Sequence, residues 1–294
     1  MSTPPGPVSP PAGESTGSPL GPSGHSPQGS LRSPGGETAG EEGASVSPPA
    51  GGSTAVGGEG GGASLPAILG HADDNLILAQ QLSGWIASAP DLEVDLALGN
   101  IALDHLGVAR ALLAHYGEVE GAGQTEDDLA MDRSEREFRN LLICEQSNGD
   151  FGQTIARQLL IDCYQVGLWE RLSSDSDPVV AGVAGKAVLE ARYHWRHSST
   201  WAERLGVGTE ESHRRVQAGL DVMSRFVDEM FDSHPDLRPS FDHRLRPVLA
   251  KAGLELAPSS FPRRGGREGL HTEHLGHILA DMQWMARSYP GAKW

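Results

Sequence analysis

The stretch that decides the fold is DPVVAGVAGKAVLEARYHWRHSSTWAERL, residues 177–205. Asp177 is a typical helix N-cap, Pro178 follows at the first helical position, and Gly206 and Gly208 end the pattern. Small and apolar residues recur at steps of three and four, which predicts an amphipathic helix with one face in a core. The inward stripe is Val180, Ala184, Ala187, Ala191, His194, Ser198, Trp201 and Leu205.

His194 stands on that stripe, and a buried imidazole needs hydrogen-bonding partners. Glu190 lies one turn before it, and Lys186 one turn before that. In carboxylate di-iron bundles, two helices each supply a Glu-x-x-His pair and two others supply one Glu each. The residue three before His194 is Ala191, which cannot bind a metal. The pattern indicates a metal helix that has kept its histidine and lost its glutamate.

Helical periodicity covers the chain after about residue 67, and no segment indicates a strand. We expect Asp73 or Asp74 to cap the first helix, and Asp132 with Glu135 to form a capping box. The expected helices are 73–87, 91–116, 132–144, 151–172, 177–205, 210–232, 241–252 and 272–288. Residues 117–131 read as a loop, and short connections elsewhere predict an all-α antiparallel bundle with extra C-terminal helices.

The segment 91–116 is apolar on nearly all sides in its first half, which is typical of a central helix. One line along it carries small and polar residues, and we expect this line to face other helices. The line is Ala97, Asn100, Asp104, Gly107, Ala111 and His115. The residue three after Asp104 is Gly107, so this helix also lacks a complete Glu-x-x-His pair.

Several polar residues are predicted to converge in the interior. The predicted cluster is Asp104, Asp162, Lys186, Glu190 and His194. Two interpretations stay open: the group binds two irons, or it forms a buried network of ion pairs, with Arg157 or Arg192 contributing. Because both pairs are incomplete, the sequence favours the network, and we assign no catalytic, cofactor-binding or metal residue.

Two other histidine patterns are weaker. Glu210 and His213 form one intact Glu-x-x-His string, but it lies in the first turn of a helix with no matching pair, where an acidic residue favours the helix dipole. His271, His274 and His277 are spaced by three, and we expect them to cap the last helix or meet another subunit rather than bind a metal.

The composition excludes several classes of protein. The 294 residues carry a net charge of −16 without a dense Lys/Arg cluster, which argues against nucleic-acid binding. Cys144 and Cys163 fall in apolar helical patterns and read as reduced core residues. We expect no run of apolar residues long enough to span a membrane and no signal peptide, and hence a cytoplasmic location.

Residues 1–66 are rich in Pro, Gly, Ser, Thr and Glu and lack aromatic residues. Such a segment cannot bury enough apolar surface to offset the entropy of ordering it. We therefore divide the chain into a disordered tail, 1–66, and a helical domain, 67–294. A binding role for the tail is an alternative hypothesis.

The helical domain resembles a known family in six places. The matching stretches are DNLILAQQLSGW (74–85), DLALGNIALDHLGVAR (95–110), REFRNLLICEQSNGDFGQTIARQ (136–158), EARYHWRHSSTWAERLGVGT (190–209), GLHTEHLG (269–276) and the PGAKW ending. On these stretches the chain resembles the C-subunit family of bacterial multicomponent phenylacetyl-CoA 1,2-epoxidases, over nearly all of the domain but not the tail.

The resemblance implies a ferritin-like fold and a non-catalytic, structural role in aerobic phenylacetate breakdown. It implies a di-iron catalytic A subunit as partner, and NADPH, FAD and iron–sulfur groups in a reductase subunit. It implies no cofactor in this chain, in agreement with the broken pairs at Gly107 and Ala191. An autonomous di-iron oxidase using Asp104, Asp162, Glu190 and His194 is the alternative hypothesis.

Overall fold

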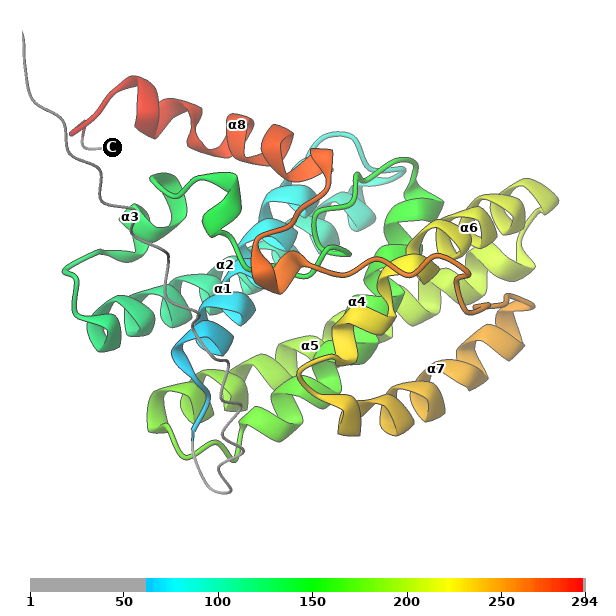
Figure 1. Cartoon of the computed structure of the whole chain (residues 1–294). Coiled ribbons are helices and arrows are strands. Elements are labelled where there is room, and N and C mark those ends of the chain that lie inside the picture. Colours follow the sequence, from blue (N-terminus) through cyan, green and yellow to red (C-terminus); the bar gives the residue numbers. More distant parts are fainter. Residues whose placement is uncertain (1–61, 293–294) are drawn as a thin grey trace, which may run out of the picture. The chain divides into compact units, whose positions relative to one another are not determined.

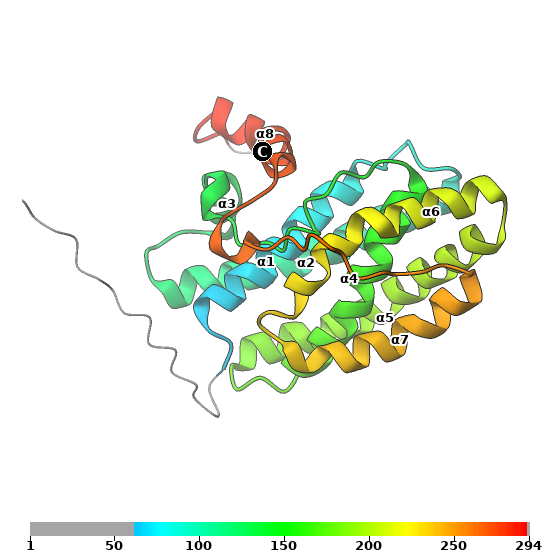
Figure 2. The same ribbon diagram turned by 45° about the vertical axis from the view of Figure 1, so that its right-hand side comes forward.

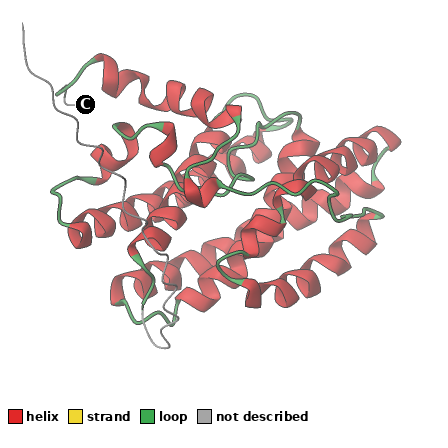
Figure 3. Ribbon diagram, in the orientation of Figure 1, coloured by secondary structure: helices red, strands yellow, loops and turns green. Residues whose placement is uncertain are grey.

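Helices are the only regular secondary structure in the computed structural model, which describes residues 62–292 (Figure 3). These residues belong to one compact unit, Val56–Trp294. The α-helices are α1 (Leu65–Ser83), α2 (Leu92–Glu120), α3 (Glu126–Met131), α4 (Phe151–Leu172), α5 (Pro178–Val207), α6 (Glu210–Met223), α7 (Arg238–Ala252) and α8 (Glu273–Ser288) (Figure 1). Short 3-10 turns lie at Glu135–Glu137 (η1), Ser224–Phe226 (η2), Asp228–Phe231 (η3), Pro235–Leu237 (η4) and Gly266–Glu268 (η5). The predicted all-α fold is confirmed, whereas residues 1–61 of the predicted tail lie outside the described residues.

Two helical hairpins form the centre of the fold. α1 packs along α2, α4 packs along α5, and α2 contacts α5, which makes a ferritin-like four-helix bundle (Figure 2). α6 covers α4, α7 lies against α5 and α4, and α8 contacts α3 and α1. The extra C-terminal helices thus cover the bundle from outside.

α5 forms as its sequence predicts. The Asp177 side chain accepts hydrogen bonds from the backbone N–H groups of Val179 and Val180, and Pro178 opens the helix. The inward face is Val180, Ala184, Ala187, Val188, Ala191, His194, Ser198 and Ala202. Trp201 and Leu205, which were predicted at the end of that stripe, are only partly buried. The predicted stripe is therefore correct from Val180 to Ser198.

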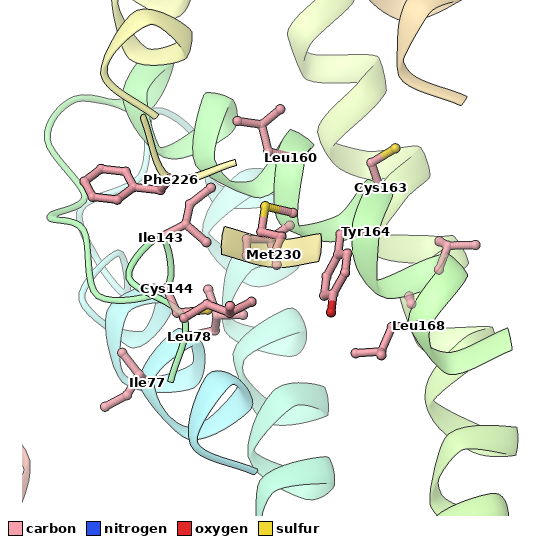
Figure 4. Packing of buried hydrophobic residues seen from close by; sticks show 14 of the residues in the cluster. Ile77, Leu78, Ile143, Cys144, Leu160, Cys163, Tyr164, Leu168, Phe226 and Met230 are labelled. Carbon is pink, nitrogen blue, oxygen red and sulfur yellow. The ribbon is translucent and has the colours of Figure 1, made fainter. Parts of the chain in front are cut away.

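A large apolar cluster fills most of the space between the helices, and a smaller one, made of Leu82, Val94, Leu98, Ile101 and Ala102, lies between α1 and α2. Leu160, Tyr164 and Leu168 of α4 lie among side chains from α1, from the segment before α4 and from η3 (Figure 4). Cys144 and Cys163 are buried free thiols, as predicted.

The first helix begins earlier than the sequence suggested. α1 starts at Leu65, with Pro66 in its first turn, and ends at Ser83. Asp73 and Asp74 are therefore not N-caps but lie in the middle of the helix, buried. The predicted helix extended to residue 87, but Ile86 lies beyond the end of α1 and is 59% exposed.

The predicted helix 132–144 is wrong. Only the turn Glu135–Glu137 is helical, and its capping box pairs Ser134 with Glu137. The backbone N–H groups of Leu141 and Leu142 bind the Asp74 and Glu229 carboxylates, respectively, rather than helical carbonyls. Tertiary hydrogen bonds therefore replace the helical ones in this segment.

Two other boundaries also differ. Most of the predicted loop 117–131 is helical, since α2 runs to Glu120 and α3 follows. A Thr125–Asp128 capping box starts α3. α6 ends at Met223 instead of 232, and the chain continues in the turns η2 and η3.

α2 has the length and composition of a membrane-spanning helix. An 18-residue window within it has a mean hydropathy of 1.3, and 44% of that window is buried. The prediction that no apolar run reaches spanning length is therefore wrong by this measure. The core helix of a bundle passes the same test, and α2 packs against α1 and α5.

Candidate functional site

Three polar side chains from three helices meet in the interior of the bundle. They are His105 of α2, Asp162 of α4 and His194 of α5, which are 2%, 1% and 3% exposed. Each offers one ligand atom, and these atoms lie within 4.8 Å of one another. The two imidazole rings have centroids 5.0 Å apart. We call these three residues the His–Asp cluster.

A neighbour on another helix orients each histidine. Nδ1 of His105 lies 2.8 Å from Oδ1 of Asn75, and this oxygen also accepts from Gln165 Nε2 at 3.4 Å. Because an amide oxygen only accepts, His105 carries its proton on Nδ1. Nε2 of His194 lies 3.1 Å from Oδ2 of Asp104 and donates to it. Each ring therefore has one nitrogen fixed as a donor.

One polar atom of each residue in the cluster lacks a partner. His105 Nε2, His194 Nδ1 and Asp162 Oδ1 are buried and have no hydrogen bond. Buried polar atoms are normally satisfied, so three unpartnered atoms in one place call for an explanation.

Burial dominates the electrostatics of the cluster. It holds the pKa of His105 well below the ordinary value, and the charges of His194 and Arg157 lower that pKa further. It raises the pKa of Asp162 to about 6, against the opposing effects of His194, a hydrogen bond from Ser198, and Arg157. His105 is therefore a neutral imidazole at neutral pH, with a free lone pair on Nε2.

The structure brings together only part of the predicted polar cluster. Asp162 and His194 are buried, and Asp104 reaches His194 from the edge with a 35% exposed side chain. Glu190 lines a small cavity beside His105 and His194 and pairs with Lys186 at 3.3 Å. The side chain of Lys186 is 76% exposed, so its predicted interior position is wrong. The ammonium group stays in water, where its solvation is strongest.

His105 was not predicted, because the line of residues expected to face the other helices is not the buried face of α2. The predicted polar line faces outward in part, since Asn100, Gly107 and Ala111 are exposed. The buried face of α2 is Val94, Leu98, Ile101, Ala102, His105, Val108, Ala109, Leu112, Leu113, His115 and Gly117. Leu98, Ile101, His105 and Val108 recur at steps of three and four, but exposed leucines recur in the same way on the opposite side, so the spacing alone did not identify the buried face.

This register changes the comparison with a di-iron centre. The residue three before His105 is Ala102, which is buried, just as Ala191 lies three before His194. Both helices thus carry Ala-x-x-His where di-iron bundles have Glu-x-x-His, so both have lost the same half of the pair. The α1 residue that contacts the cluster is Asn75, whose side-chain amide hydrogen-bonds to His105 and supplies no carboxylate. Asp162 is the sole carboxylate of the cluster, and this donor set does not fit two irons.

The other histidine patterns do not form metal sites in the described part of the chain. His213 Nδ1 binds the Gly206 carbonyl at 2.8 Å, while Glu210 is exposed. His271 binds Glu145 Oε2 at 2.7 Å and the Phe138 carbonyl at 3.0 Å. His271 therefore attaches the segment just before α8 to the segment before α4. It lies near the start of the last helix, as the sequence predicted.

Comparison with known proteins agrees with this architecture. Residues 62–294 match the family described as phenylacetic acid catabolic protein. The chain is 43% identical over 237 residues to the C subunit of the 1,2-phenylacetyl-CoA epoxidase of Escherichia coli (strain K12). That alignment covers 76% of this chain and 95% of the relative. The resemblance expected from the sequence is confirmed: the chain belongs to the phenylacetic acid catabolic protein family.

Proposed function

We propose that this chain is a non-catalytic, structural subunit of a cytoplasmic phenylacetyl-CoA 1,2-epoxidase complex. It pairs with the di-iron catalytic subunit and stabilises that subunit's helical bundle. Oxygen activation takes place in the catalytic subunit, and a reductase subunit with flavin and iron–sulfur groups delivers electrons from NADPH. The similarity to the C subunit of such an epoxidase supports this assignment.

One observation carries the non-catalytic part of the proposal. The two helices that would supply Glu-x-x-His pairs carry buried alanines, Ala102 and Ala191, at the glutamate positions. A methyl group cannot bind a metal, and the cluster's single carboxylate, Asp162, cannot replace the missing ones. The chain therefore has the bundle of a di-iron protein without its ligand set.

The surface of α2 supports the pairing. Four exposed leucines lie at spacings that place them on one face of the helix. They are Leu92, Leu96, Leu103 and Leu106, with exposures of 68%, 59%, 65% and 36%. Gly99 and Gly107 are on this side, and a Cβ on either would meet open space, so another helix can approach closely. α5, which contacts α2, adds the exposed Leu189 and Tyr193.

A row of exposed apolar side chains along one helix face is typical of a protein–protein interface. We commit to the di-iron catalytic subunit as its occupant, because the similar protein is itself one subunit of a multi-subunit epoxidase. In this proposal, one apolar face of α2 packs in the bundle and the other, with the four exposed leucines, packs against the catalytic subunit.

The test is co-purification of the catalytic subunit with this chain, followed by phenylacetyl-CoA-dependent NADPH oxidation with the reductase. The double variant Leu96→Glu/Leu103→Glu places two charges on the α2 surface and should weaken pairing at least tenfold, a loss of about 1.4 kcal/mol. Its own stability should change by no more than about 0.5 kcal/mol per site, because both side chains are exposed.

Phe261→Glu is the matched control, since Phe261 is an 80% exposed apolar residue outside α2 and α5. This variant should pair normally. Equal activity of the catalytic subunit with and without this chain would refute the proposal, as would about two bound irons per molecule of this chain purified alone.

A further inference from the structure

We propose that the His–Asp cluster binds one zinc-type divalent cation, with His105 Nε2, His194 Nδ1 and Asp162 Oδ1 as its ligands. Such an ion would tie α2, α4 and α5 together at the centre of the bundle. A single redox-inert cation supplies no oxygen chemistry, so this site is independent of the proposed structural role and compatible with it.

The unpartnered atoms are the first argument. The three proposed ligand atoms are the ones that lack hydrogen bonds, on side chains that are at least 97% buried. The ligand atoms these side chains offer lie within 4.8 Å of one another. Ligands about 2.0–2.2 Å from a tetrahedral zinc are roughly 3.3–3.6 Å apart, so small side-chain rotations close the site.

The hydrogen bonds around the histidines are the second argument. A metal-binding histidine nearly always donates its other N–H to a carboxylate or carbonyl oxygen. His194 donates to the Asp104 carboxylate, and His105 donates to the Asn75 amide oxygen. Both rings are thereby held in the tautomer that leaves the inward nitrogen free. A packing histidine would not need this arrangement twice at one place.

The space beside the histidines decides between metals. A cavity of about 10 Å³ lies next to them; Asn75, Asp104 and Glu190 also line it, whereas Asp162 does not. That is room for about one water molecule. Tetrahedral zinc with three protein ligands needs one further ligand, whereas octahedral iron with the same donor set needs three. The geometry therefore favours zinc over iron.

The charges near the site agree. Asp162 is buried, and none of the ion pairs among the described residues joins it to a cationic side chain. The nearby guanidinium of Arg157 instead donates to the Gln146 carbonyl at 2.7 Å and to Asn148 Oδ1 at 2.9 Å. A bound dication would supply the missing positive charge.

The experiment uses the untagged full-length chain, freed of metal with a chelator and titrated with Zn²⁺ by calorimetry and with Co²⁺ by visible absorption. We expect one equivalent of each, a tetrahedral Co²⁺ spectrum, and a melting temperature that rises with Zn²⁺ concentration. His105→Gln, Asp162→Asn and His194→Gln should each weaken binding by about 100-fold or more. Asp104→Asn, which leaves all three ligands in place, should weaken it roughly 10–100-fold.

His115→Gln is the matched control. His115 is another buried histidine of α2 that pairs with a carboxylate, Asp177 at 2.7 Å, but it lies outside the cluster. Its loss should leave Zn²⁺ affinity unchanged. The proposal is overturned if the folded wild-type chain binds neither ion, if Co²⁺ is octahedral, or if binding survives in the three ligand variants. Because Asp104 is partly exposed, Asp104→Asn keeps the test decisive should a ligand variant fail to fold.

Discussion

Two of the buried polar regions in the described part of the chain differ in one respect. In the first, four carboxylates, those of Asp73, Asp74, Glu145 and Glu229, have a partner for every oxygen. In the second, the His–Asp cluster, each residue keeps one atom without a partner. Polar burial alone thus does not mark a functional site in this protein. Unpartnered atoms also occur on His71, Asn140 and His234, but the described residues bring three potential ligand side chains together only in the His–Asp cluster.

The first region attaches irregular segments to the helices. Asp73 accepts from Arg133 Nη1 at 2.9 Å and from the Arg139 backbone at 2.8 Å. Asp74 accepts from the Leu141 backbone at 2.7 Å and from Arg267 Nη2 at 2.6 Å. Two adjacent carboxylates of α1 therefore hold both the segment before α4 and the C-terminal segment.

Two further carboxylates complete this scaffold. Glu229 accepts from the backbone N–H groups of Gly265 and Gly266 at 2.9 and 2.8 Å. Gly265 has φ of 127°, a conformation that favours glycine. Glu145 accepts from the Thr272 backbone at 2.6 Å and from His271. These bonds fix the start of α8.

The largest expected effect comes from breaking the complete region. Asp73→Ala leaves the 6% exposed Arg133 side chain without its counter-ion and should lower the free energy of unfolding by about 3–5 kcal/mol. Urea denaturation measures this loss. Asp236→Ala removes the partner of Arg171 in a pair that is half exposed on both sides, and should cost less than about 1 kcal/mol. Equal losses would show that the burial of Asp73 carries no special weight.

The same kind of change in the His–Asp cluster should have the opposite outcome. In chelator-treated protein at pH 8, Asp162→Asn should leave the free energy of unfolding within about 1 kcal/mol of wild type or raise it. The amide has nearly the shape of the carboxylate but avoids the cost of a buried charge without a cation partner. A loss as large as that of Asp73→Ala would mean that Asp162 belongs to a satisfied network after all.

Zinc should sharpen this contrast. Free Zn²⁺ at a concentration of about 100 times its Kd should raise the free energy of unfolding of the wild-type chain by about 2.7 kcal/mol. Asp162→Asn should lose this gain, because it removes a ligand, whereas His115→Gln should keep it. Thermal unfolding with and without Zn²⁺ measures both, and a gain that persists in Asp162→Asn would assign the effect to another site.

The smallest effect is expected from pH. Burial opposes the charge on His271, but the hydrogen bond and charge of Glu145, with the Phe138 carbonyl and Glu135, raise the pKa of His271 above its ordinary value. The stability this pair contributes is complete below the unfolded pKa near 6.5 and is lost as pH rises through the higher folded pKa. Between pH 6 and pH 9, the melting temperature of wild type should fall about 2 °C more than that of His271→Gln. A larger fall in the variant would reverse the assigned direction.

The sequence by itself determined the elements whose signals are local. The N-cap Asp177 and the helices 151–172 and 177–205 were predictable, because capping and the packing of residues three and four apart are local features of the sequence. The buried position of His194 followed from the same spacing.

The tertiary structure alone decided the rest. α2 is apolar on both sides, so its pattern names no unique inward face, and only packing against α1 and α5 buries His105 rather than Asp104. The segment after residue 137 has helical periodicity, but carboxylates distant in sequence take its backbone N–H groups. In both places the deciding partners are far away in the chain, and no local pattern encodes them.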